Sequence, residues 1–218
     1  MTETPPAEET QPANETQPAN KTPPANKTRP EGLAGSEHPP HRPSDRPPVQ
    51  SRLRPLAESD LPQLAQLFAD PELAGEYAWY GFGSVVGLSR RLAEDGGLSP
   101  TSGFLGIEVP EGLAGYLSWY QHYYGGAAGS WSWRFGMGLL PFGRGRGVGT
   151  ASVLQFSSYL FDNTPAHRIE SCVDADHTIS ARILDRAGYR CEGRLRQAEF
   201  RAGRWRDLLM YAQLRSDR

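Results

Sequence analysis

The chain has 218 residues with a formal net charge of −2, and 38% of its residues are hydrophobic, which suffices for one ordinary domain and a further segment. This near-neutral charge gives no reason to expect a nucleic-acid partner. Neither end carries an apolar run long enough to span a membrane, so we expect a soluble, cytoplasmic protein with no membrane partner.

The first 50 residues differ in composition from the rest of the chain. They hold most of the prolines, and a six-residue unit that begins at Glu9 recurs at Glu15 and Lys21. They show no apolar periodicity that would build a core. The sequence therefore predicts a disordered, proline-rich tail over residues 1–50 and a folded domain over residues 51–218.

The first half of the folded domain predicts a strand, two helices and a hairpin. Asp60 precedes Leu61-Pro62 as a helix cap, and leucines follow at helical spacing. Pro110-Glu111-Gly112 is a turn between two strand-like runs. The expected elements are a strand at 52–56, helices beginning at 61 and at 84, and strands at 104–109 and 113–122.

The centre of the domain changes from strand to helix periodicity. Every second residue from Trp131 to Leu139 is apolar, which predicts a half-buried strand at 130–139. Apolar residues then recur at helical spacing and predict a helix at 147–161.

The last part of the chain alternates strands and a helix and then closes with two strands. The expected elements are a strand at 167–173, a helix that Asp176 caps and Gly188 ends, and strands at 189–201 and 205–214. Cys172 and Cys191 lie in apolar, strand-like settings and are expected to be buried free thiols, and no spacing indicates a metal site. This order of elements predicts an α+β fold with a mixed sheet.

Four glycines alternate at the joint between the central strand and the helix that follows. Glycines 143, 145, 147 and 149 leave backbone N–H groups free to surround an anion at the positive end of a helix dipole. A merely flexible turn is the alternative. The joint lacks the Gly-Lys-Ser/Thr ending of a Walker A loop, and it misses the third glycine of the dinucleotide fingerprint.

The pattern Arg144-x-x-Gly147-x-Gly149 in this joint resembles the coenzyme A loop of the GNAT superfamily of acyl-CoA-dependent N-acyltransferases. The resemblance implies a mixed, mostly antiparallel central sheet flanked by helices, with acetyl-CoA as co-substrate. It also implies that the loop holds the pyrophosphate of coenzyme A. The implied contact residues are Arg144, Gly145, Arg146, Gly147, Val148, Gly149 and Thr150.

Three later segments resemble the RimJ/RimL branch, which acetylates protein N-terminal amines. They are Ser180-x-x-x-Leu184-x-Arg186-Ala187-Gly188-Tyr189, the run Glu192 to Phe200, and Gly203-x-x-x-Asp207-x-x-x-Tyr211. The branch usually has Asn at the start of the preceding helix, where it contacts coenzyme A. Here His177 takes that place and can still donate a hydrogen bond.

Acetyl transfer to an amine needs a neutral amine, a polarised thioester carbonyl and a proton for the departing thiolate. The backbone N–H groups of Leu139 and Leu140 are candidates for polarising the carbonyl. Gly136 and Gly138 leave room for the pantetheine arm beside the strand. No covalent intermediate on the enzyme is required, and neither cysteine has a recognisable nucleophile arrangement.

The resemblance points to Glu199 as the general base, and its apolar neighbours give a local reason for a raised pKa. The alternative is an ion pair with a nearby arginine. Ser180 matches the family serine near the thiolate, with a surface helix serine as the alternative. Tyr211 is a further candidate for that proton, although a strand tyrosine usually lies in a core. The arginine-rich run from 182 to 206 is expected to be a solvated face.

The sequence thus predicts an N-acetyltransferase that moves an acetyl group from acetyl-CoA to a primary amine by direct transfer. The acceptor is a protein N-terminus or a small-molecule amine, and a homodimer is compatible with the sequence. The alternative is a catalytically inactive module that binds acyl-CoA or acts as a scaffold. His177 favours this alternative, while Arg144-x-x-Gly147-x-Gly149 and Glu199 oppose it.

Overall fold

The computed structural model describes residues 50–218 except Ala128, so the prediction for the first 50 residues lies, apart from Gln50, outside the described residues. The strands are β1 (Arg52–Pro55), β2 (Leu98–Ser99), β3 (Ser102–Val109), β4 (Gly112–Tyr123), β5 (Trp131–Leu139), β6 (Arg168–Asp174), β7 (Arg190–Arg201) and β8 (Arg204–Leu214). The helices are α1 (Leu61–Ala69), α2 (Pro71–Ala74), α3 (Val86–Asp95), α4 (Val148–Asn163) and α5 (Thr178–Arg186). Every predicted strand and helix is present, and β2 and the single turn α2 are additional.

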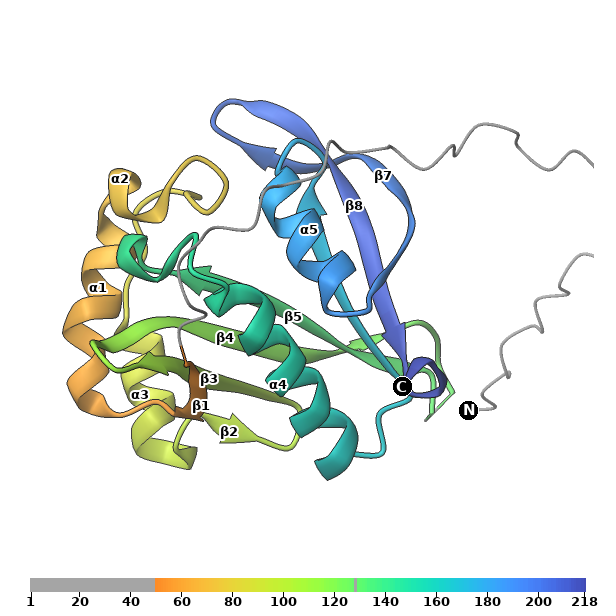
Figure 1. Cartoon of the computed structure of the whole chain (residues 1–218), viewed down its shortest axis with the longest axis horizontal. Helices are drawn as coiled ribbons and strands as arrows, with labels where there is room; N and C mark the ends of the chain where they lie inside the picture. The colour runs from red at the N-terminus through yellow and green to blue at the C-terminus, as the bar shows by residue number, and fades with distance from the viewer. Residues whose placement is uncertain (1–49, 128) are drawn as a thin grey trace, which may run out of the picture. The chain divides into compact units, whose positions relative to one another are not determined.

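The strands form one eight-stranded sheet in the order β1-β3-β4-β5-β6-β8-β7, with β2 paired to β3 (Figure 1). Neighbouring strands are antiparallel except β5 and β6, which are parallel and are joined through α4. A parallel pair needs such a crossover connection because the chain must return to the same end of the sheet. The predicted α+β fold with a mixed, mostly antiparallel sheet is therefore confirmed.

The two parallel strands separate after a short contact. β5 and β6 pair only at Trp133 with Ile169 and at Arg134 with Glu170, although β5 continues to Leu139 and β6 to Asp174. Ser171 Oγ donates to the Phe135 carbonyl at 3.0 Å, and this is where the contact ends. Beyond it, the edge of β5 that faces β6 has no strand partner among the described residues, so the sheet opens in its middle.

Apolar side chains cover the two faces of the sheet differently. The main core packs α4 and α5 against one face, with Phe156, Leu160 and Leu184 among its buried residues. A smaller core places α1 and α3 against the other face of β3 and β4, around Leu64 and Leu88. Helices α4 and α5 lie in front of the sheet in Figure 1, and α1 to α3 lie at its left. On the side of α1 to α3, no helix of the described residues packs its buried side chains against β6 or β8.

Several local predictions are wrong because tertiary contacts replace the local ones. The N-cap of α5 is His177, not Asp176, whose side chain is exposed. Asp60 is the N-cap residue of α1, as predicted, but its carboxylate pairs with Arg54 and accepts the Ala57 N–H, so it makes no capping hydrogen bond to α1. Both cysteines are free, but Cys191 is exposed. None of the described helices is long and apolar enough to cross a membrane.

Candidate acetyl-CoA and acceptor site

The glycine loop presents a set of unpaired backbone donors at the start of α4. Gly145 and Gly147 adopt positive φ angles of 69° and 79°, which are left-handed conformations that glycine tolerates without strain. Within the described residues, no acceptor is assigned to the N–H groups of positions 145 to 150. Because α4 is 16 residues long and its dipole is positive at this end, these donors form a site for an anion such as a pyrophosphate.

The two arginines of the loop hold it in place. Arg144 Nε donates to the Leu139 carbonyl at 2.9 Å, and its Nη2 donates to the Ala74 carbonyl at 3.2 Å. Arg146 Nη2 pairs with Glu111 Oε1 at 2.6 Å. Arg144 thereby joins the loop to the end of α2, so its side chain fixes the loop's position instead of pointing out of it.

The last two glycines of the loop have different structural roles. A Cβ on Gly147 would meet no protein atom within 4 Å, so the space beside this residue is open. A Cβ on Gly149 would lie 2.8 Å from Ile183 Cδ1 and 3.2 Å from Met137 Cε. Gly149 is therefore required by packing between α4, α5 and β5, whereas Gly147 borders open space.

The open edge of β5 offers backbone donors beside this loop. The N–H of Leu140 donates to the Ala114 carbonyl at 2.8 Å, on the β4 side. Backbone groups of successive strand residues point to opposite edges, so the N–H groups of Met137 and Leu139 face the opening towards β6. The assignment of Leu140 as a carbonyl-polarising donor is therefore wrong, because its N–H is already used within the sheet, and Leu139 remains.

The two strand glycines also differ. A Cβ on Gly138 would lie 2.6 Å from the ring of Tyr116, so this glycine accommodates an aromatic side chain of β4. A Cβ on Gly136 would meet only Ser118 Oγ, at 3.9 Å. Free space along this face of β5 is thus found at Gly136, and the proposal that Gly138 leaves room for a ligand is wrong.

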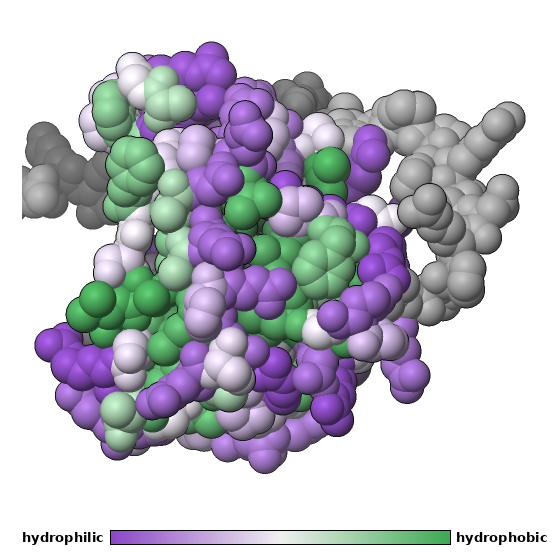
Figure 2. All heavy atoms as spheres, turned by 90° about the vertical axis from the view of Figure 1, so that its left-hand side faces the viewer, coloured by the Kyte–Doolittle hydropathy of each residue, from purple (hydrophilic) through white to green (hydrophobic). Residues whose placement is uncertain are grey.

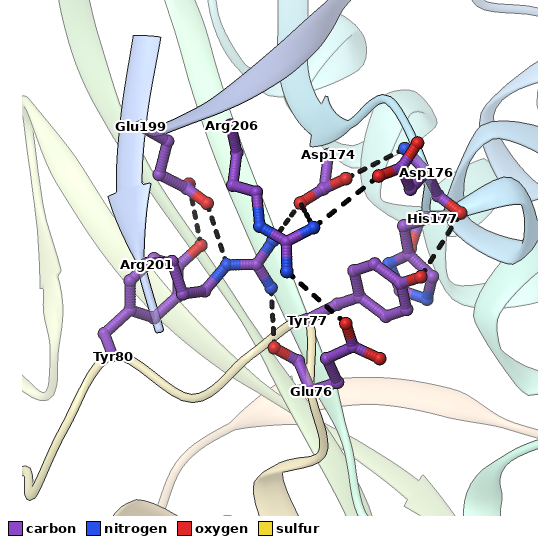
Figure 3. Close-up of polar contacts among 10 residues, drawn as sticks. Glu76, Tyr77, Tyr80, Asp174, Asp176, His177, Glu199, Arg201 and Arg206 are labelled. Carbon is purple, nitrogen blue, oxygen red and sulfur yellow. Dashed lines mark hydrogen bonds and ion pairs between the residues drawn. The ribbon is translucent and has the colours of Figure 1, made fainter. Parts of the chain in front are cut away.

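A buried cluster of charges lies where β6, β7, β8 and the segment after α2 meet (Figure 3). The Arg201 side chain is fully buried and pairs with the Asp174 carboxylate. Arg201 Nη1 also donates to the Glu76 carbonyl at 2.7 Å, which ties the segment after α2 to the sheet. Arg206 shares Asp174 and lies 3.5 Å from Asp176 Oδ2. Two buried arginines therefore neutralise Asp174 and hold these four segments together.

Glu199 lies at the edge of this cluster and is partly exposed. Its Oε1 accepts a hydrogen bond from Arg201 Nε at 3.0 Å, and its Oε2 accepts one from the Tyr80 hydroxyl at 2.9 Å (Figure 3). The ion pair expected as the alternative to a catalytic role is thus present. It does not exclude that role, because each carboxylate oxygen can accept a second hydrogen bond.

His177 connects the cluster to α5. Its ring stacks on Tyr77 with centroids 4.1 Å apart, and its Nδ1 lies 2.9 Å from Ser180 Oγ. Burial lowers the pKa of His177 below its ordinary value of 6.5, nearby Asp174 opposes this shift, and Arg201 and Arg144 add to it. The imidazole is therefore neutral near pH 7 and can donate to, or accept from, the Ser180 hydroxyl.

Tyr211 does not belong to this site. Only 4% of its surface is exposed, and it is a member of the main core beneath α4 and α5. It pairs across the sheet with Ser171, whereas Cys172 and Asp174, one and three residues further along β6, point to the other face. Burial raises its pKa to about 12, with Asp185 adding to the shift. This geometry supports the packing alternative and corrects the catalytic assignment of Tyr211.

Tyr80, Arg201 and Asp174 also line this site, although the sequence did not predict them. The arginine-rich run was expected to be a solvated face, whereas Arg201 and Arg206 are buried. One signal was present in the sequence: Arg201 follows Glu199 by two residues on a strand, so both side chains point to the same face. Nothing local indicates that Tyr80 reaches Glu199.

The surface around this region is mixed in polarity. Seen from the side of α1 and α2, apolar residues gather in the middle of the face and polar residues surround them (Figure 2). Tyr80, Phe82, Phe200 and Trp205 are among the exposed large hydrophobic residues of the domain. Among the described residues, no group of three or more His, Cys, Asp or Glu side chains is placed to hold a metal ion.

Comparisons with known proteins agree with this architecture. A spermidine N-acetyltransferase from Vibrio cholerae, solved with CoA and spermine, matches with a TM-score of 0.64 at 20% identity, over 77% of this chain and 97% of its own. A GNAT-family acetyltransferase from Bacillus anthracis matches with a TM-score of 0.61 at 19% identity, over 77% and 96%. A ribosomal-protein-alanine N-acetyltransferase from Brucella melitensis matches with a TM-score of 0.59 at 20% identity, over 75% and 99%.

These identities establish a shared fold and no shared substrate. A comparison with curated proteins gave no match. The family model described as an acetyltransferase (GNAT) domain matches residues 51–190, which is more than half of the chain. The chain therefore belongs to the GNAT acetyltransferase family.

Proposed function

We propose that the protein transfers an acetyl group from acetyl-CoA to a primary amine, directly and without a covalent enzyme intermediate. The observation that carries this proposal is the row of unpaired N–H groups from Gly145 to Thr150, beside the opening between β5 and β6. The pyrophosphate of coenzyme A binds at this row, as at other helix N-termini. The pantetheine arm lies along the open edge of β5, and the N–H of Leu139 polarises the thioester carbonyl.

The acceptor amine enters from the face that carries the charged cluster. Glu199 accepts the proton that the amine must lose, and Ser180, which contacts His177, supplies a proton to the thiolate. Arg144 positions the loop from Leu139 and Ala74. His177 stands at the start of α5, where its ring can contact coenzyme A in place of the usual asparagine.

The acceptor is a cationic amine. The carboxylates of Glu76 and Asp176 lie against Arg206 in the same charged cluster, with 60% and 75% of their side-chain surfaces exposed. They attract an ammonium group to the site before it loses its proton. Two sources fit this chemistry, a protein N-terminus as in the RimJ/RimL branch, and a small amine such as the spermidine on which the Vibrio cholerae enzyme acts.

The test is an amine panel in which released CoA is followed with a thiol reagent. The panel contains spermidine, a simple primary amine, a peptide with a free N-terminus and the same peptide N-acetylated as a matched control. Turnover is expected with at least one free amine and none with the acetylated peptide. Binding of acetyl-CoA without turnover of any amine in the panel would refute the proposed transferase activity and would support a binding module.

The variant Glu199→Gln tests the base. It keeps the shape of the side chain and an oxygen that accepts from Arg201, while its NH2 group can only donate to the Tyr80 oxygen, and it removes the basicity. The turnover number should fall roughly 10²–10⁴-fold, with the affinity for acetyl-CoA unchanged. The loss should shrink at high pH, where solvent supplies free amine. Normal turnover in this variant would show that Glu199 is structural.

A further inference from the structure

Tyr80 is the residue that occupies the accessible side of Glu199. Both carboxylate oxygens already accept a hydrogen bond, Oε1 from the buried guanidinium of Arg201 and Oε2 from the Tyr80 hydroxyl. Solvent cannot reach Glu199 from the side of Arg201, because the Arg201 side chain has no exposed surface. An amine that approaches Glu199 from solvent on the other side therefore meets the Tyr80 hydroxyl.

The position of Tyr80 is fixed although the residue lies in the segment between α2 and α3. The Arg201 guanidinium lies 5.4 Å from the ring centre of Tyr77 and 5.8 Å from that of Tyr80. The same guanidinium binds the Glu76 carbonyl in this segment. Tyr80 nevertheless keeps 66% of its surface exposed. The ring is thus anchored on its inner side and open to a substrate on its outer side.

We propose that Tyr80 is a catalytic residue that relays the amine's proton to Glu199, an inference that rests on the proposed acetyl transfer. The Tyr80 oxygen accepts the proton of the substrate ammonium as its own hydroxyl proton moves to Glu199 Oε2. One N–H bond and one O–H bond break, and two O–H bonds form. The products are a neutral amine, a neutral tyrosine and a protonated Glu199, so no other reactant is required.

The surroundings of Tyr80 suit a relay. Although most of the Tyr80 surface is exposed, desolvation of its hydroxyl beside the cluster and its bond to Glu199 raise the pKa of Tyr80 to about 12, so the phenol remains protonated and hydrogen-bonded near pH 7. It therefore passes a proton on without becoming a stable tyrosinate. The charges that act on Tyr80 are those of Glu199, Arg201 and Asp174, and the charge of Glu199 also reaches Cys172 on β6. Arg206 joins this cluster at Asp174, Glu76 joins it at Arg206, and Tyr77 lies against Arg201.

The variant Tyr80→Phe tests the relay, with Tyr77→Phe as the matched control. Both changes remove one hydroxyl from a ring beside Arg201, but the Tyr77 hydroxyl meets only the Asp176 carbonyl, at 3.4 Å. In Tyr80→Phe, kcat should fall about ten- to hundredfold, because water replaces the hydroxyl as a less well placed relay. The affinity for acetyl-CoA and the thermal midpoint should stay near those of the wild type, and Tyr77→Phe should keep its kcat.

The pH profile separates a relay from a merely structural contact. A relay defect should shrink as pH rises and free amine becomes available. A loss that is equal at all pH values, or one confined to KM, would show that Tyr80 only positions the segment and would overturn the proposal.

The double variant Tyr80→Phe/Glu199→Gln is a second test of the relay. Two groups that act in series should lose no more together than Glu199→Gln loses alone. Losses that multiply would overturn the relay. If Tyr80→Phe turns over normally and Glu199→Gln is impaired, the relay is refuted and the proposed function stands. If Glu199→Gln turns over normally, Glu199 is not the general base.

Discussion

Replacement of Gly147 by alanine separates ligand binding from folding at the glycine loop. The residue has a φ of 79° and no protein atom within 4 Å of an added Cβ, so the folding cost is conformational strain alone. That strain is about 1–2 kcal/mol for a left-handed residue. It corresponds to a fall of roughly 2–8 °C in the thermal midpoint of a domain of this size.

Gly96, which follows α3, is the matched control. It has a φ of 67° and equally open surroundings, but it lies outside the proposed coenzyme A site. Gly96→Ala should therefore lower the midpoint by the same amount as Gly147→Ala. Gly149 is unsuitable for this comparison, because its added Cβ would meet Ile183 at 2.8 Å and disturb the core.

Only Gly147→Ala should weaken acetyl-CoA binding. A methyl group there displaces the pyrophosphate from N–H donors, and a hydrogen bond to a charged group contributes about 1.5–3 kcal/mol. One lost contact thus means a Kd that is about ten- to hundredfold higher. Calorimetric titration of both variants measures this difference. Equal affinities in two folded variants would refute the placement of the cofactor at this loop.

Three further predictions follow from the tail, the charged cluster and His177. A chain that begins at Ser51 should keep its thermal midpoint and its turnover of small amines, because residues 1–50 show no core-forming pattern; a large loss of stability would show that they dock. Arg201→Met should cost about 3–5 kcal/mol in chemical denaturation, because it leaves Asp174 buried with one partner fewer; a negligible cost would contradict the anchoring role. The pKa of His177 is depressed from 6.5 in the folded protein, so the unfolded chain binds this proton first. Wild-type stability should therefore fall as pH drops below about 6.5, and this part of the slope should vanish in His177→Asn.

The buried ion pairs hold the side chains of the proposed acceptor site in place by contacts within the protein alone. Arg201 binds Asp174, Glu199 and the Glu76 carbonyl at once, so it fixes three chain segments with one side chain. A guanidinium suits this role because its donors lie in a rigid plane, and lysine would not reproduce the geometry. Glu199 and Tyr80 are thereby held in contact before any amine arrives, which lowers the reorganisation needed for proton transfer.

The sequence by itself determined the elements and the place of the proposed coenzyme A loop. Alternation from Trp131 to Leu139 and helical spacing after Gly147 predict β5 and α4, because burial of one face imposes its period on neighbouring residues. The glycines of the loop are also a local signal, since positive φ angles at Gly145 and Gly147 are a property of single residues.

Only the tertiary structure decided which groups meet at the proposed acceptor site. The Tyr80 hydroxyl binds a carboxylate 119 residues away, and Arg201 binds a carbonyl 125 residues away. The structure also showed that the Leu140 N–H is used by β4 and that Tyr211 lies in the core. Such contacts depend on how strands and the segment between α2 and α3 pack in space, and no periodicity within one segment encodes them.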